Sequence, residues 1–151
     1  MGLNWPNTNH NYVPAYQQSG VPFVTSSVVD QCTTNAAGVV RVRFPYVTRW
    51  VIINTTGQTG GLRVGFSEFG VQGPFAATAC GAYHVTGTNA NYFVIPKDTT
   101  SQRLEIKCRE MWFRGHDNSS GFSLMAGYTN IPTNQFLILT GASGSNFQGV
   151  G

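Results

Sequence analysis

An alternating run of residues at 102–113 constrains the fold of this chain more than any other stretch. Leu104, Ile106 and Cys108 fall on one side of an extended chain, and the positions between them are charged. This period of two predicts a long β-strand with one side in the core and the other in water. The pattern then slips by one residue at Glu110, which falls on the apolar side. The slip indicates a bulge or a second packing partner, as at a β-sandwich corner or a subunit contact.

The composition favours an all-β fold. At 151 residues the chain has the length of one domain, with 10% charged residues, 13% aromatic residues and 18 glycines. Sparse charge with many glycines and aromatic residues is typical of short strands joined by tight turns. The net charge of +3 comes from basic residues spread over the strands, so we do not expect nucleic-acid binding.

Alternation and turn residues predict about eight strands and no helix. The expected strands are Val21–Val29, Val39–Phe44, Val47–Thr55, Leu62–Phe69, Asn91–Pro96, 102–113, Gly121–Thr129 and Gln135–Thr140. The third is apolar on both sides, which predicts a central strand that is covered on both faces or paired at an interface, with Trp50 and Ile52 in the core. Eight short antiparallel strands fit a jelly roll or an immunoglobulin-like sandwich. The long loop at 70–89 and the absence of a Cys–Trp–Cys pattern favour a single jelly-roll-like antiparallel β-sandwich.

Cysteine use and the amino terminus indicate the compartment. Cys32, Cys80 and Cys108 are an odd number with wide spacing, so we expect three reduced, largely buried thiols and no intrachain disulfide. The sequence begins without a basic and apolar leader and has no stretch long enough to span a membrane. We therefore expect a protein that is not secreted and is kept in a cytoplasm or in something assembled there.

The two ends of the chain carry no charge. Residues 1–29 lack formal charge, and their prolines recur every eight residues, which excludes a helix and favours extended chain. We divide the chain into an extended N-terminal arm at 1–20, a β-sandwich at 21–140 and a Gly-rich tail at 141–151. The aromatic residues assigned to the assembly arm are Trp5, Tyr12, Tyr16 and Phe23. A disordered tail is the alternative, but such tails are usually charged and poor in aromatic residues.

Residues 118–151 are uncharged as well. Charge keeps a free monomer in solution, and both ends of this chain lack it. A closed assembly that hides the ends is the simplest physical explanation.

Signals for chemistry are sparse. His10, His84 and His116 are scattered without the spacing of metal ligands, and His116 with its neighbours in 117–119 is better explained as a polar turn than as a hydrolytic triad. Glu68, Glu105 and Glu110 would serve glycoside hydrolysis only if two of them came together, and we expect Glu105 and Glu110 to pair with basic residues across strands instead. We predict no catalytic residues, no metal site and no cofactor.

A family resemblance extends over most of the chain. The strings that carry it are Pro22–Ser27, Phe44–Trp50, Leu62–Phe66, Asn91–Val94, Arg103–Cys108, Ala126–Pro132, Thr140–Gly141 and Gln148–Gly151. Together they resemble the small single jelly-roll capsid proteins of large icosahedral double-stranded DNA viruses, the penton type in particular. The resemblance implies a structural virion protein that forms a homopentamer at the five-fold vertex and contacts neighbouring capsid proteins.

Two other classes of protein remain open. A glycan- or receptor-binding sandwich, which can itself sit on a virion surface, would stack sugars on exposed aromatic rings, with Trp5, Tyr83 and Trp112 as candidates. Such a protein would be a soluble monomer that binds sugar. An enzyme would need polar groups converging in a pocket, and the sequence contains no pattern that predicts one.

Overall fold

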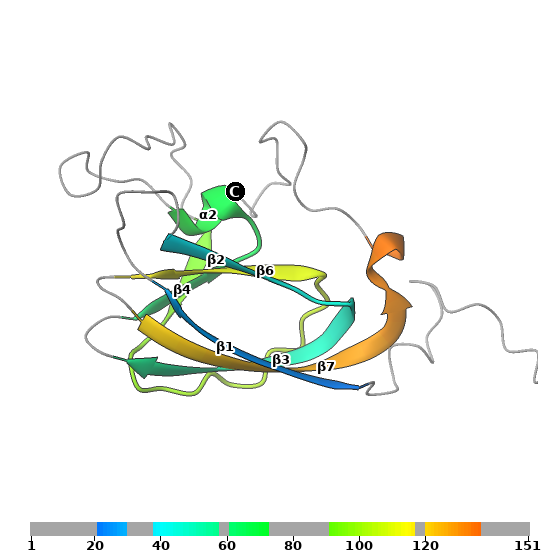
Figure 1. Ribbon diagram of the computed structural model, residues 1–151, viewed down its shortest axis with the longest axis horizontal. Coiled ribbons are helices and arrows are strands. Elements are labelled where there is room, and N and C mark those ends of the chain that lie inside the picture. Colours follow the sequence, from blue (N-terminus) through cyan, green and yellow to red (C-terminus); the bar gives the residue numbers. More distant parts are fainter. Residues whose placement is uncertain (1–20, 30–37, 58–60, 73–90, 117–119, 137–151) are drawn as a thin grey trace, which may run out of the picture.

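The fold is an antiparallel β-sandwich, as predicted. The computed structural model describes residues 21–29, 38–57, 61–72, 91–116 and 120–136. The arm at 1–20 and the tail at 141–151 lie outside these residues. Figure 1 shows the two sheets as two layers, with β1, β7 and β3 in one and β2, β6, β4 and β5 in the other. Their bounds are β1 Pro22–Val29, β2 Val39–Arg43, β3 Tyr46–Gly57, β4 Leu62–Gly65, β5 Tyr92–Ile95, β6 Glu110–Gly115 and β7 Ser120–Pro132.

Strands from the first half of the chain pair with strands from the second half in reverse order. β1 pairs with β7, β2 with β6 and β4 with β5, all antiparallel. β3 is bridged along its outer edge to residues 100 and 104. Two further pairings, of β3 with β7 and of β4 with β6, join these pairs into the two sheets. The described strands therefore pair in a nested order, with the outermost pair formed by the first and last strands.

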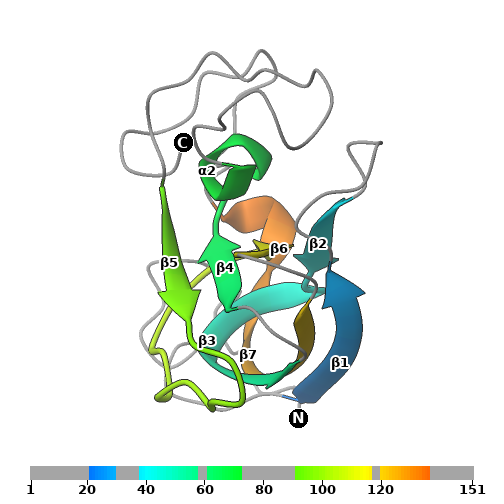
Figure 2. The same ribbon diagram turned by 90° about the vertical axis from the view of Figure 1, so that its left-hand side faces the viewer.

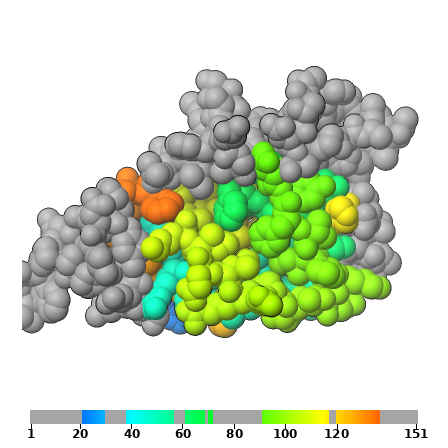
Figure 3. Space-filling view, turned by 180° about the vertical axis from the view of Figure 1, so that it is seen from behind, coloured from blue at the N-terminus to red at the C-terminus, as the bar shows by residue number. Residues whose placement is uncertain are grey.

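The run at 102–113 is two elements and not one strand. Residues 100–108 lie along β3, where Val51 and Leu104 exchange backbone hydrogen bonds of 2.9 and 2.8 Å. From Glu110 onward the chain is β6, between β2 and β4 of the other sheet. The predicted change of packing partner at Glu110 is confirmed, and the prediction of a single strand is wrong because the chain crosses between the sheets there. In Figure 3, which views the molecule from behind Figure 1, the part of the chain from β5 to β6 forms most of the described surface.

Two buried threonines of β3 hold the chain between residues 96 and 108 beside that strand. The Thr48 hydroxyl donates to the Ile106 carbonyl at 2.7 Å and accepts from the Cys108 amide at 3.0 Å. The Thr55 hydroxyl donates to the Pro96 carbonyl at 2.7 Å and accepts from the Thr99 amide at 3.0 Å. These side chains satisfy backbone groups that a regular ladder would otherwise pair.

The core lies between the sheets. Its inward residues alternate along the strands, with Val42 of β2 and the following Phe44 on one side and Phe122, Leu124, Ala126 and Tyr128 of β7 on the other. Phe113 of β6 stacks on Phe122 of β7 with ring centroids 4.3 Å apart. Contacts of this kind between the layers supply most of the stability of a sandwich.

Two elements differ from the predicted strands. The strand expected at 62–69 ends at Gly65, and Glu68–Gln72 form a one-turn helix, α2, because the Ser67 hydroxyl accepts the Gly70 amide at 2.9 Å as a helix cap. The prediction that a strand begins at Gln135 is wrong, because β7 ends at Pro132 and Thr133–Gln135 form the 3-10 turn η2. Residues 137–140 lie outside the described part. No helix among the described residues is long and apolar enough to cross a membrane.

β3 lies at one side of its sheet, and the central strand is β7. Val51 and Ile53 are fully buried, whereas Trp50 and Ile52 are half-buried on the outward side. The prediction that Trp50 and Ile52 fill the core is therefore wrong, because the core side of β3 is the opposite one.

Two adjacent isoleucines on β3 test this assignment. Ile53→Ala should lower the free energy of unfolding by about 2–5 kcal/mol, because it leaves a cavity in the core. Ile52→Ala is the matched control on the outward side and should cost roughly 1 kcal/mol. Chemical denaturation of the two variants measures both values, and equal losses would contradict the assigned sides of β3.

Candidate assembly surface

Most of the predicted site residues lie outside the described part of the chain. This is the case for Trp5, Tyr12 and Tyr16 of the arm and for Tyr83. Phe23 and Trp112 are described, and the structure changes the interpretation of both.

Phe23 belongs to the sandwich and not to the assembly arm. It lies in β1 and packs against the core, with ring centroids 5.5 Å from Phe44 and 5.6 Å from Tyr128. The prediction that it contacts a neighbour as part of an arm is therefore wrong. Alternation along β1 turns Phe23 inward and its two sequence neighbours outward.

Trp112 is not an open platform for a sugar. It is half-buried on β6, and the Arg41 guanidinium lies 4.9 Å from the centre of its ring. Arg41 is fixed there because its Nε donates to the Glu110 carboxylate at 3.0 Å. The Trp112 indole N–H is buried without a hydrogen-bond partner among the described residues. A ring covered by a cation on one face and buried at its N–H offers little area for stacking.

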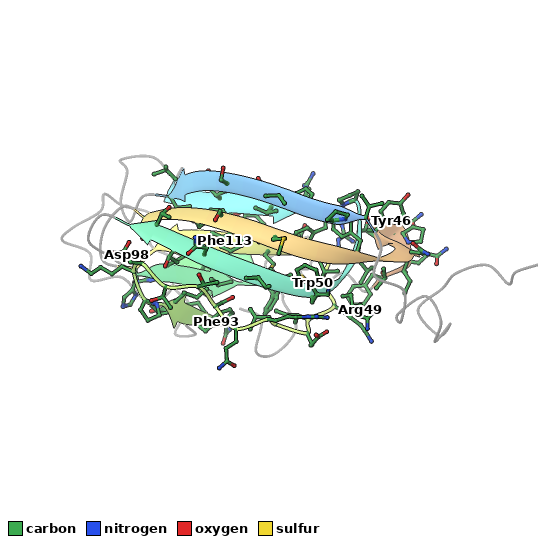
Figure 4. The ribbon with its side chains drawn as sticks, turned by 90° about the horizontal axis from the view of Figure 1, so that it is seen from below. Tyr46, Arg49, Trp50, Phe93, Asp98 and Phe113 are labelled. Atoms are coloured by element: carbon green, nitrogen blue, oxygen red, sulfur yellow. The ribbon has the colours of Figure 1, made fainter. Side chains whose placement is uncertain are left out.

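The outward side of the three-stranded sheet is an uncharged surface that sequence reasoning did not identify. Pairing across β1, β7 and β3 places its residues in four rows, and Figure 4 shows this side of the sheet. The rows, which we call the neutral face, are Pro22–Gly127–Trp50, Val24–Met125–Ile52, Ser26–Ser123–Asn54 and Val28–Gly121–Thr56. None of these twelve residues carries a charge.

The neutral face exposes aliphatic side chains. Val24 is 69% exposed and Val28 is 70% exposed, and Met125 between Val24 and Ile52 is 41% exposed. Directly opposed residues on neighbouring strands have Cβ atoms about 4.5–5.5 Å apart, so Val24, Met125 and Ile52 form one continuous apolar row. An exposed apolar row whose own residues carry no charge is typical of a surface that another molecule covers.

Trp50 closes one end of the neutral face. Its indole lies against Gly127 so closely that a Cβ added at Gly127 would be 2.4 Å from the indole nitrogen. The guanidinium of Arg103 lies 5.1 Å from the centre of the same indole ring system. Trp50, which Figure 4 labels, is therefore held between a glycine and an arginine.

The two edges of this sheet differ in charge. Along the β3 edge, residues 103, 105 and 107 are exposed and charged, and Arg103 pairs with Glu105 at 2.7 Å. Glu105 was expected to pair across strands, and it pairs within its own segment, whereas Glu110 does pair across strands with Arg41. β1 contains no charged residue, and among the described residues no strand pairs with its outer edge. Charges on an edge strand hinder pairing with another chain, so β1 is the open edge of the sheet.

Basic residues gather on the other sheet. Arg63 and Arg114 are directly opposed on β4 and β6, and both are buried. Burial, and then the charge of Arg63, lowers the pKa of Arg114 to about 10. The Arg63 Nε donates to His116 Nδ1 at 3.1 Å, and its guanidinium lies 4.6 Å from the centre of the Tyr92 ring. These contacts hold His116 as part of a structural network, and residues 117–119 of the predicted polar turn lie outside the described part of the chain.

The described residues contain no group of three His, Cys, Asp or Glu side chains that could hold a metal ion. Cys108, the one cysteine they include, is a free buried thiol. Burial raises the pKa of its thiol to about 11. A protonated, buried thiol is a poor nucleophile.

The sequence did contain a signal for the neutral face. The two uncharged stretches of the chain, 1–29 and 118–151, include β1 and β7, and these strands are neighbours in the sheet. The absence of charge was visible, but the pairing that joins the two stretches in one surface was not.

Comparisons with known proteins found no match to this chain among protein-family models, curated proteins or solved structures.

The buried thiol gives a testable outcome. In a Cys32→Ser, Cys80→Ser variant, Cys108 should resist alkylation in the folded state near the ordinary thiol pKa of about 8.5 and react fully after unfolding. Because the folded pKa is raised, stability should fall as pH rises from the ordinary thiol pKa toward about 11. Mass spectrometry after timed alkylation measures the reactivity. Equal rates in the folded and unfolded states would contradict the burial of Cys108.

Proposed function

We propose that this protein is a structural subunit of a virus capsid, of the penton type, that assembles with copies of itself into a closed ring and with neighbouring capsid proteins into a shell. The observation that carries the proposal is the neutral face, because an exposed apolar surface continuous with uncharged chain ends suits a subunit whose faces and ends are covered in an assembly.

The topology supports a single jelly roll as the fold of this subunit. A jelly roll has eight strands in two sheets built from two Greek keys, and it is a common fold of viral capsid domains. The nested pairing of β1 with β7, β2 with β6, residues 100–108 with β3, and β4 with β5 is the arrangement of a rolled hairpin. Counting residues 100–108 as the eighth strand gives two sheets of four.

The difference between the two sides of the sandwich supports a ring over a two-fold dimer. A closed ring of more than two subunits needs two different surfaces on each subunit, which contact each other around the ring. Figure 2 shows β1 with β2 on one side of the sandwich and β5 on the other. The β1 side offers an uncharged edge, and the opposite side carries the charged segment 103–107 with the exposed Phe93 and Val94 of β5.

Sugar binding is less well supported than assembly. A glycan site needs an open aromatic ring, whereas Trp112 is covered by Arg41, and Trp50 is held between Arg103 and Gly127. The neutral face presents aliphatic and small polar side chains, which suit a protein partner better than a sugar.

Removal of the arm tests the assembly function. Deletion of residues 1–18 should leave the sandwich folded, with its β signature in circular dichroism intact, because the described core begins at β1. The truncated chain should assemble poorly, since it lacks the uncharged aromatic segment that precedes the neutral face. Native mass spectrometry and electron microscopy of the full and truncated chains measure assembly.

A matched control replaces residues 1–18 by a Gly/Ser segment of equal length, which keeps the length and removes the aromatic side chains and prolines. It should assemble as poorly as the truncated chain. A full-length chain that remains a monomer, or a truncated chain that assembles as well as the full chain, would contradict the proposal.

A further inference from the structure

The open edge of β1 favours a partner of particular chemistry. Its backbone groups face outward over Pro22–Val29, a length of about 27 Å, and its outward side chains are the exposed Val24, Ser26 and Val28. A charged peptide placed there would bury its charges against an uncharged surface without partners, which is unfavourable. The edge therefore suits an extended, uncharged, partly apolar segment.

Residues 1–20 of this chain have that chemistry. They carry no formal charge, contain Trp5, Tyr12 and Tyr16, and are directly joined to β1. Twenty extended residues span at most about 70 Å, more than twice the length of β1. Prolines at 6 and 14 restrict the unbound segment, which lowers the entropy lost when it binds.

The start of β1 directs this segment away from its own strand. Pro22 is the first residue of β1, and the residue before a proline is restricted to extended conformations. Val21 therefore continues the line of β1 instead of reversing it in a tight turn. A segment of twenty residues that starts in this direction is long enough to reach a neighbouring copy.

We propose that the 11–17 stretch of a neighbouring copy binds as an added antiparallel strand along the open edge of β1, with side chains over Val24 and Val28 of the neutral face. The inference rests on the proposed self-assembly and identifies its contact. Addition of a strand to an exposed sheet edge is a common mode of peptide recognition.

The position of Pro14 fits an added strand. Alternate residues of a strand direct their backbone groups to the same edge, so residues 11, 13, 15 and 17 can pair with β1 while Pro14 faces away. The missing N–H of Pro14 then costs no ladder hydrogen bond, as is usual for proline in an edge strand. Tyr12 and Tyr16 would share one face of such a strand, because they are four residues apart.

Site-specific photo-cross-linking tests the proposal on the full chain. Benzoylphenylalanine replaces Tyr16, and in a second preparation Tyr12, in unlabelled copies that are mixed before assembly with unmodified copies carrying heavy nitrogen. After irradiation, mass spectrometry identifies the joined peptides. The expected product joins the arm of an unlabelled copy to the β1 or β7 peptide of a labelled copy.

Two exposed, uncharged residues provide the matched mutational test. Val24→Lys places a charge on the proposed contact, and Gln135→Lys places the same charge on η2, outside the neutral face and outside β5. Both residues are exposed, so both variants should fold. Val24→Lys should weaken association by about tenfold or more, because the added charge is desolvated in the contact, and Gln135→Lys should weaken it far less.

Several results would overturn this inference. Cross-links confined to the same copy would mean that the arm folds back on its own β1. Cross-links between two β1 peptides would mean that the strands of two copies pair directly. Normal association of the Val24→Lys variant, or a larger loss for Gln135→Lys, would place the contact elsewhere. In each of these cases the proposed assembly stands, whereas a full-length chain that never associates overturns both.

Discussion

The sandwich depends on the pairing of β7 with strands on both of its edges. β1 pairs along one edge and β3 along the other, so all three strands share one register. That register turns Phe122, Leu124 and Ala126 into the core and Met125 to the outside. Because side chains alternate along every strand, fixing the inward residues of β7 also fixes the composition of the outward face. The neutral face is thus a direct consequence of how the core is built.

Local alternation in the sequence was enough to predict much of the fold. β1, β2, β5 and β7 lie where the pattern predicts them, and the alternating residues Phe122, Leu124, Ala126 and Tyr128 of β7 are buried. The all-β sandwich also follows from composition. These features depend on neighbouring residues only, and they need no knowledge of which strands pair.

Other features depend on partners far away in the sequence. The alternation at 102–113 is the same whether its first half lies beside β3 or continues β6. That half is placed by Thr48, which binds Ile106 and Cys108 from 58 and 60 residues earlier in the chain. The same limitation led to the wrong prediction for the side chains of β3, since apolar residues on both sides do not reveal which side faces the core. Phe23 was grouped with the arm because it lies in the uncharged stretch 1–29, although the predicted strand Val21–Val29 already included it.

Only part of the candidate surface could be predicted from the sequence. Uncharged ends indicated an assembling protein, but Val24, Met125 and Ile52 come from three separate parts of the chain and form a row only through strand pairing. The account rests on one physical claim, namely that copies associate through an uncharged surface. Light scattering of the full-length chain at low and high salt tests this claim most directly. Apolar contacts are maintained or strengthened by added salt, whereas contacts between charged residues are screened. We predict a closed oligomer whose mass is unchanged at high salt. A monomer at every salt concentration, or an oligomer that dissociates as salt is raised, would contradict the account.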